Sequence, residues 1–251
     1  MFKVILKTIG VTILIVYLAV CGFVWRTGEP PMVYKNVRVV ICDSANAQFI
    51  SRIDVMRVVT SADSLNPKGR LAAEFNAYAL EQALEKNSLI ENADCYPTPD
   101  STLRIDIYQR RPILRIKSED LGRDYYVDVN GQLMNYKASK KAVNVPLATG
   151  HITKEIATGP LFTLAEFLRD HPKWDRSICQ IYVERNGDIR LIPVKGGHTI
   201  LLGPIDDYKA KFERLETFYD KVLDRKGWNS YQTLNLKFKG QVVAEKVNKT
   251  N

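Results

Sequence analysis

The feature that most constrains this chain is an uncharged, strongly apolar run at residues 8–25. Lys3 and Lys7 precede this run, and Arg26 follows it. A helix needs roughly 20 apolar residues to cross the hydrocarbon core of a bilayer. The sequence therefore predicts one membrane-spanning helix, with a tail of residues 1–7 on one side and a large folded part on the other.

Two alternatives for the apolar run stay open. A cleaved signal peptide would have a shorter apolar region and an Ala-x-Ala site, and neither fits this sequence. A lipoprotein cleavage site is suggested before Cys21, but Val20 stands where a small residue is expected. We therefore expect a retained anchor. Positive charge is nearly balanced across the run, so the expected orientation, tail inside and C-terminal part outside, follows the usual result for this layout.

The distribution of basic residues along the chain does not favour nucleic-acid binding. The formal net charge is +8, of which Lys3 and Lys7 contribute two. Basic charge is typical of proteins that meet nucleic acid, anionic membranes or acidic partners. Here the Lys and Arg residues are scattered and no RNA-binding signature accompanies them. A solvated basic surface near anionic lipid is the favoured interpretation.

The cysteines do not form a metal or redox motif. Cys21 lies in the apolar run, and Cys42, Cys95 and Cys179 lie beyond it without any C-x-x-C spacing. Cys42 and Cys95 fall in predicted strands of the same subdomain, so they are the plausible pair in an oxidising compartment. Free, buried thiols are the favoured alternative.

After a linker at residues 26–32, the periodicity predicts one β-α-α-β-β unit. Its first helix is capped by Ser51, and its second carries an apolar face. The predicted elements are a strand at 33–42, a helix ending near Val59, a helix with Leu71, Phe75, Ala79, Ala83 and Leu84 on one face, and strands at 90–96 and 103–107.

Beyond residue 111 the pattern changes to short strands, with hairpins predicted at Asn130-Gly131 and Asn186-Gly187. Together the two parts predict an α+β fold whose second part is a mixed β domain with two flanking helices. Its strands are expected at 113–116, 125–129, 132–134, 143–147, 178–184, 188–193, 199–202, 233–238 and 241–247. One helix is expected at 163–171, with Thr163 and Glu166 as a capping box, and another from Asp206 or Asp207 to Gly227, with Phe212, Leu215, Tyr219 and Val222 on one face.

The sequence lacks a catalytic constellation, so we predict no catalytic, cofactor-binding or metal-binding residues. No H-E-x-x-H or nucleophile-elbow motif occurs. Each isolated polar group has a structural interpretation. His151, His171 and His198 are interpreted as structural histidines, and Asp124 and Asp128 lie on one face of a strand. Asp206-Asp207 is interpreted as a helix cap, and Glu119-Asp120 lies in a polar turn. Gly196-Gly197 is a lone pair between strands and not a phosphate-binding loop. A binding module is favoured over an enzyme.

The arrangement resembles the FtsQ/DivIB family of cell-division proteins over nearly the whole chain. The most specific segment is YQRRPILRI at residues 108–116, followed by YYVDVNG at 125–131. Residues 143–150 and 192–203 are similar to later strands of the family. The unit at 33–111 resembles a POTRA domain, and 112–251 resembles the family's β domain.

The resemblance implies a non-enzymatic, membrane-anchored divisome scaffold without a cofactor. Members bind FtsB and FtsL and help regulate septal peptidoglycan synthesis, and their POTRA unit contacts other divisome components. It also implies single-pass insertion in the bacterial inner membrane, with the C-terminal domain in the periplasm at the septum. The alternatives are a membrane-tethered periplasmic enzyme with an unrecognised site and a POTRA-bearing transport or assembly partner.

The resemblance also implies where FtsB binds. The matching C-terminal segment supplies Leu236, Lys237, Phe238, Val242, Val243, Ala244 and Glu245. An edge strand offers unpaired N–H and C=O groups that an incoming strand can pair with. The alternative is an edge strand that is only shielded by the charged residues Lys237, Lys239, Glu245 and Lys246.

Overall fold

The computed structural model describes residues 10–21, 31–42, 48–118, 120–135 and 143–247. Residues 10–21 are helical. Within the described ranges, no helix combines the length and apolarity needed to cross a membrane. Residues 8–9 and 22–25 of the predicted span lie outside these ranges, and so does the tail, so the span stays a prediction.

The first folded unit has the predicted β-α-α-β-β order. It contains β1 (Asn36–Ile41), α2 (Arg52–Val59), a short 3-10 turn (Asp63–Leu65), α3 (Ala77–Glu85), β2 (Ile90–Thr98) and β3 (Thr102–Gln109). The sheet order is β1-β3-β2, with β1 parallel to β3 and β2 antiparallel to it. Its core includes the fully buried Leu103, Ile105 and Ile107, which alternate along β3 as expected.

The caps explain where the two helices begin. At α2 the predicted Ser51 cap is confirmed: its Oγ accepts the Asp54 amide, and the Asp54 carboxylate accepts the Ser51 amide. The second helix was expected to include Leu71 and Phe75, which is wrong, because α3 begins only at Ala77 after the Asn76 cap. Phe75 is nevertheless buried and contacts the Tyr34 ring. Its apolar side chain therefore belongs to the core, although the residue precedes the helix.

The second unit is built on a nine-stranded sheet with order β12-β11-β10-β9-β8-β7-β4-β5-β6. Its strands are β4 (Pro112–Ser118), β5 (Tyr125–Asp128), β6 (Leu133–Asn135), β7 (Leu147–Gly150), β8 (Ile178–Val183), β9 (Ile189–Pro193), β10 (Thr199–Gly203), β11 (Tyr231–Asn235) and β12 (Val243–Lys246). Its helices are α4 (Lys154–Thr158), α5 (Pro160–Asp170), α6 (Tyr208–Phe218), a π-helical turn (Tyr219–Leu223) and α7 (Asp224–Lys226). Both Asn-Gly hairpins are confirmed, β5–β6 and β8–β9.

Several predicted boundaries in this unit are wrong. The strand expected at 143–147 is β7, which begins only at Leu147, and α4 was not expected at all. The helix expected from Thr163 begins at Pro160, so Thr163 lies inside α5, where its hydroxyl donates to the Gly159 carbonyl instead of capping. Proline is favoured at the first helical position because its missing N–H would have no partner there.

The start of α6, the helix after β10, also differs from the prediction. Asp207 holds the N-cap position with φ 49°, but no side-chain capping bond forms. Asp206 instead pairs with the Lys211 ammonium at 2.9 Å. The predicted end at Gly227 holds, because the chain there adopts φ 94°, which glycine tolerates without strain.

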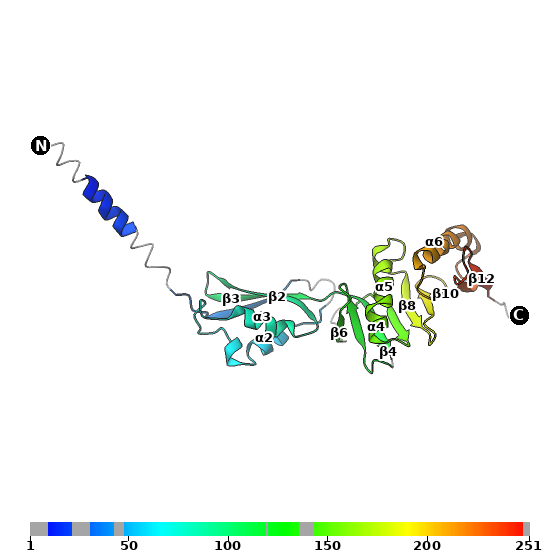
Figure 1. Ribbon diagram of the computed structural model, residues 1–251, viewed down its shortest axis with the longest axis horizontal. Helices are drawn as coiled ribbons and strands as arrows, with labels where there is room; N and C mark the ends of the chain where they lie inside the picture. The colour runs from blue at the N-terminus through cyan, green and yellow to red at the C-terminus, as the bar shows by residue number, and fades with distance from the viewer. Residues whose placement is uncertain (1–9, 22–30, 43–47, 119, 136–142, 248–251) are drawn as a thin grey trace.

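The two units have separate cores that meet at the β5–β6 hairpin. Val127 packs into the core of the second unit, whereas Tyr126 and Met134 pack into the core of the first. Phe49 contacts the Tyr126 ring with centroids 5.6 Å apart. Figure 1 shows the consequence: the two sheets lie along the long axis of the molecule, with β6 next to the first unit and β12 at the far end.

Candidate functional site

The candidate site is the far end of the nine-stranded sheet, where β12 pairs with β11 alone. The register pairs Asn235 with Val243 and Leu234 with Ala244, in an antiparallel ladder. Its other side has no neighbouring strand among the residues that the structure describes. The expected edge strand therefore exists, although it is shorter than the expected 241–247.

The direction of each β12 amide follows from one hydrogen bond. The Val247 amide donates to the Ser230 carbonyl at 3.3 Å, toward β11. Amides along a strand alternate in direction, so those of Val243 and Glu245 also point toward β11. The amides of Ala244 and Lys246 then point to the open side, where an added strand would pair.

The predicted partner-binding residues divide into three groups. Leu236 is fully buried, and its amide donates to the Leu201 carbonyl at 2.9 Å. It therefore anchors the segment after β11 to β10 and does not face a partner. Val242 and Ala244 are partly buried against the core. Phe238, Val243, Lys237 and Glu245 are exposed, and Phe238 and Val243 are 50% and 45% exposed as apolar side chains.

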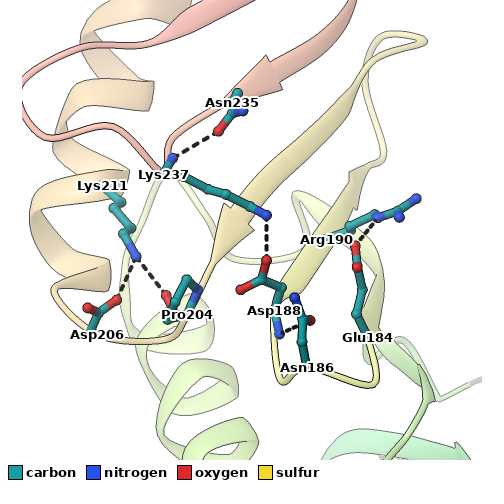
Figure 2. Close-up of polar contacts among 9 residues, drawn as sticks. All are labelled: Glu184, Asn186, Asp188, Arg190, Pro204, Asp206, Lys211, Asn235 and Lys237. Carbon is teal, nitrogen blue, oxygen red and sulfur yellow. Dashed lines mark hydrogen bonds and ion pairs between the residues drawn. The ribbon is translucent and has the colours of Figure 1, made fainter.

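Lys237 is held in place by contacts that sequence reasoning missed. Figure 2 shows its ammonium donating to the Asp188 carboxylate, directly before β9, while its amide donates to Asn235 Oδ1 at 3.0 Å. The side chain crosses Gly203, where an added Cβ would lie 2.8 Å from Lys237 Cγ. Lys237 therefore ties the segment between β11 and β12 to the sheet, in addition to any role in shielding the edge.

The same ion pair sets the protonation of Asp188. The hydrogen bond from Lys237 lowers the pKa of the Asp188 carboxyl from its ordinary value, and the Asp188 amide is oriented by Asn186 Oδ1 at 3.0 Å. A sequence signal for Asp188 existed only in its position directly after the Asn186-Gly187 turn. Nothing local indicated that its partner would come from a residue so far along the chain.

A second lysine stabilises the turn beside this ion pair. Lys211 is 6% exposed, and its ammonium donates to the Pro204 carbonyl at 2.6 Å and to Asp206 at 2.9 Å (Figure 2). A buried ammonium needs such partners, because leaving it unpaired costs several kcal/mol. These contacts fix the β10–α6 turn that flanks the candidate edge.

The acidic residues considered for chemistry have structural partners. Asp128 is buried, pairs with Arg110 at 2.7 Å and accepts the Asn130 and Gln132 amides. Asp124 pairs with Arg115 at 2.9 Å. These two carboxylates therefore organise the β5 hairpin separately and do not act as a pair. Glu119 lies outside the described residues.

The three histidines lie in different environments. His198 is buried and bonds the Tyr219 hydroxyl at 2.8 Å, and burial lowers the pKa of its imidazole. His151 accepts from Arg185 Nε at 3.1 Å, and His171 contacts the Phe167 ring. Within the described ranges, no three His, Cys, Asp or Glu residues gather as a metal site would require.

The cysteines are free thiols, including the Cys42 and Cys95 pair that could have formed a disulfide. Burial raises the pKa of the Cys95 thiol to about 12. Cys42 and Cys179 are exposed, so the expectation that all these thiols are buried is wrong for both.

Comparison with known proteins identifies the family. The family model described as "FtsQ/DivIB, C-terminal related" matches residues 111–245, more than half of the chain. The chain belongs to the FtsQ/DivIB family. A model described as a POTRA-like domain matches residues 33–108. The family resemblance inferred from the sequence is therefore confirmed.

Two individual FtsQ/DivIB proteins that match this chain share low sequence identity with it. "Cell division protein FtsQ" from Geotalea daltonii is 21% identical over 179 residues, which cover 67% of this chain and 63% of that protein. The chain thus spans less than two thirds of that relative's length. The major extracytoplasmic domain of the cell division protein DivIB from Geobacillus stearothermophilus matches 47% of this chain and 96% of its own, with 16% identity and a TM-score of 0.31.

Proposed function

We propose that this protein is a non-enzymatic divisome scaffold that binds FtsB- and FtsL-type proteins and helps regulate septal peptidoglycan synthesis. The observation that supports this proposal is the free edge of β12 in a chain of the FtsQ/DivIB family. An open strand with outward amides can accept a partner strand by backbone pairing. The adjacent exposed Phe238 and Val243 supply apolar side-chain contacts.

The membrane arrangement is part of the same proposal. Residues 1–7 form a cytoplasmic tail, 8–25 span the inner membrane, 26–32 link the span to the POTRA-like domain at 33–111, and the β domain occupies 112–251 in the periplasm at the septum. The uncharged sequence of residues 8–25 supports this topology. A reporter fused after Asn251 should be active only if it works in the periplasm, and a mature N-terminus at or after Cys21 would contradict the retained anchor.

The POTRA-like domain offers a second surface, for other divisome components. Ile53 on α2 is 71% exposed and Tyr78 on α3 is 67% exposed. Aromatic side chains such as that of Tyr78 are enriched at protein–protein interfaces. We therefore assign recruitment to this helix pair and FtsB binding to the β12 edge.

The decisive experiment separates these two surfaces. Phe238→Glu and Tyr78→Glu each place a charge on an exposed aromatic position of a different unit. In the full chain, Phe238→Glu should weaken FtsB affinity about tenfold or more, as expected for an interface aromatic, while Tyr78→Glu leaves it unchanged. Equal FtsB affinity for the parent and Phe238→Glu would contradict the proposed edge site.

A further inference from the structure

A cavity of about 570 Å³ lies at the joint between the two units, away from the β12 edge. It is lined by the end of β3 and the start of β4, the segment before β7, the end of α5 and the α5–β8 turn. Its volume is in the range typical of small-molecule sites, about 300–1,000 Å³. It therefore has room for an organic ligand in addition to water.

The cavity lining carries an excess of positive charge. Four arginines contribute to it, Arg110, Arg111, Arg169 and Arg176, against one carboxylate, Asp175. Arg110 is compensated by Asp128 at 2.7 Å and Arg169 by Asp170 at 2.6 Å.

The other two arginines have little or no compensation. Arg111 has no ion pair among the residues that the structure describes. Arg176 has only a 3.7 Å contact with Asp175, and its side chain is 71% exposed. Two guanidinium groups are thus available to an anion.

Two lining residues also carry nitrogen atoms that are buried behind the cavity surface and lack acceptors. Trp174 is 2% exposed, and neither its indole Nε1 nor the Arg110 Nε has a hydrogen-bond partner among the described residues. A buried donor without an acceptor costs about 1–3 kcal/mol. Arg176 adds backbone strain, with φ 57°, a conformation that non-glycine residues rarely adopt. Local backbone strain of this kind clusters at functional sites.

The rest of the lining includes both polar and apolar side chains. Ile113, Leu168 and Ile178 are buried core residues that also border the cavity. A ligand that fits both parts has an oxyanion beside an apolar group. Arginine suits such a ligand, because its planar guanidinium binds carboxylate and phosphate through two parallel hydrogen bonds.

We propose that this joint cavity is a binding site for an organic anion, a carboxylate or phosphate attached to an apolar group. Arg111 and Arg176 supply the uncompensated charge, and the apolar side chains of the lining contact the apolar group. Because the cavity is bordered by residues from both sides of the joint, an occupant also braces the two units against each other. This inference goes beyond the proposed scaffold function and does not depend on FtsB binding.

The test uses the full chain labelled with ¹⁵N at tryptophan. The chain has three tryptophans, so Trp174→Phe assigns the Trp174 indole resonance. The probes are N-acetyl-L-phenylalaninate, its neutral amide, phenyl phosphate and inorganic phosphate. The expected result is a saturable shift of the Trp174 indole signal with an organic anion, and about tenfold or weaker binding of the neutral amide.

Matched variants separate the cavity from general charge. Arg111→Gln with Arg176→Gln should weaken anion binding about tenfold or more, whereas Arg52→Gln with Arg57→Gln, which removes the same charge from α2, should not change it. Preference for the carboxylate would indicate a peptide or amino-acid derivative as the natural source, and preference for phenyl phosphate a phosphorylated one. The proposal is overturned if the amide binds equally well, if both double variants behave alike, if no probe saturates, or if inorganic phosphate alone binds, which would show an adventitious ion only.

Discussion

The two ends of the nine-stranded sheet differ in what lies beside them. At one end, the β5–β6 hairpin places Tyr126 and Met134 in the core of the POTRA-like unit, with 4% and 0% exposure. At the other end, β12 pairs with β11 alone, and its Val243 is 45% exposed. Both end strands are short, β6 with three residues and β12 with four. The comparison teaches that strand length does not distinguish a covered end of the sheet from an open one, whereas the contacts of the side chains do.

The largest expected effect is at the covered end. Met134→Ala removes a fully buried side chain shared between the two units, so it should lower the free energy of unfolding by about 2–5 kcal/mol. The matched change at the open end, Val243→Ala, should cost less than about 0.5 kcal/mol. Denaturant titrations of both variants test this prediction. Similar losses in the free energy of unfolding at the two positions would contradict the difference between the covered and the open end.

A smaller effect is expected inside the β12 half of the sheet, at His198. Replacement by Gln should cost about 1–3 kcal/mol at pH 7, because the bond with Tyr219 is lost in a buried setting. Burial holds the pKa of His198 below its ordinary value, so the folded state favours the neutral imidazole. The stability from this group is therefore present above about pH 6.5 and falls as the pH drops through the folded pKa.

Melting temperature measured from pH 7.5 to 5 checks the sign of this dependence. The parent should lose stability on acidification through this window, and His198→Gln should lose less over the same interval. A parent stability that rises on acidification in this range would contradict the burial of a neutral His198.

A still smaller stability effect than that of His198→Gln is expected at the ion pair beneath the open edge. Asp188→Asn should cost about 0.2–1 kcal/mol at pH 7, since one partner, Lys237, is 39% exposed. The hydrogen bond from Lys237 lowers the pKa of Asp188, so its contribution is present above about pH 4 and is lost as the pH falls through the folded pKa. Unfolding curves between pH 7 and 2.5 should show this acid-linked loss in the parent and not in the variant.

Local sequence patterns predicted the parts of this fold that are decided locally. The Ser51 capping box and the Asn130-Gly131 and Asn186-Gly187 hairpins need only a few neighbouring residues, and all three occur. Tertiary contacts decided the rest. Phe75 matches a helical apolar face but packs on Tyr34 from a turn, and the strand expected at 143–147 pairs with β4 and β8 only from Leu147 onward.

The candidate site shows the same division. The existence of an edge strand near the C-terminus could be predicted, because a hairpin of alternating residues is a local pattern. The contact between Lys237 and Asp188 could not, because it depends on β11 lying parallel to β10 and on the space above Gly203. The joint cavity was likewise beyond prediction, since its arginines come from segments that are separate in the sequence.

The central claim, that the open side of β12 receives a strand of FtsB, is tested most directly by a pair of proline variants. Proline removes the backbone donor. At Ala244 the lost N–H points to the open side, whereas at Val243 it points toward β11. FtsB affinity and melting temperature are measured for the full chain with each change. We predict that Ala244→Pro keeps the parent's melting temperature and loses FtsB affinity, while Val243→Pro lowers the melting temperature. If Ala244→Pro stays folded and binds FtsB as tightly as the parent, the claim is contradicted.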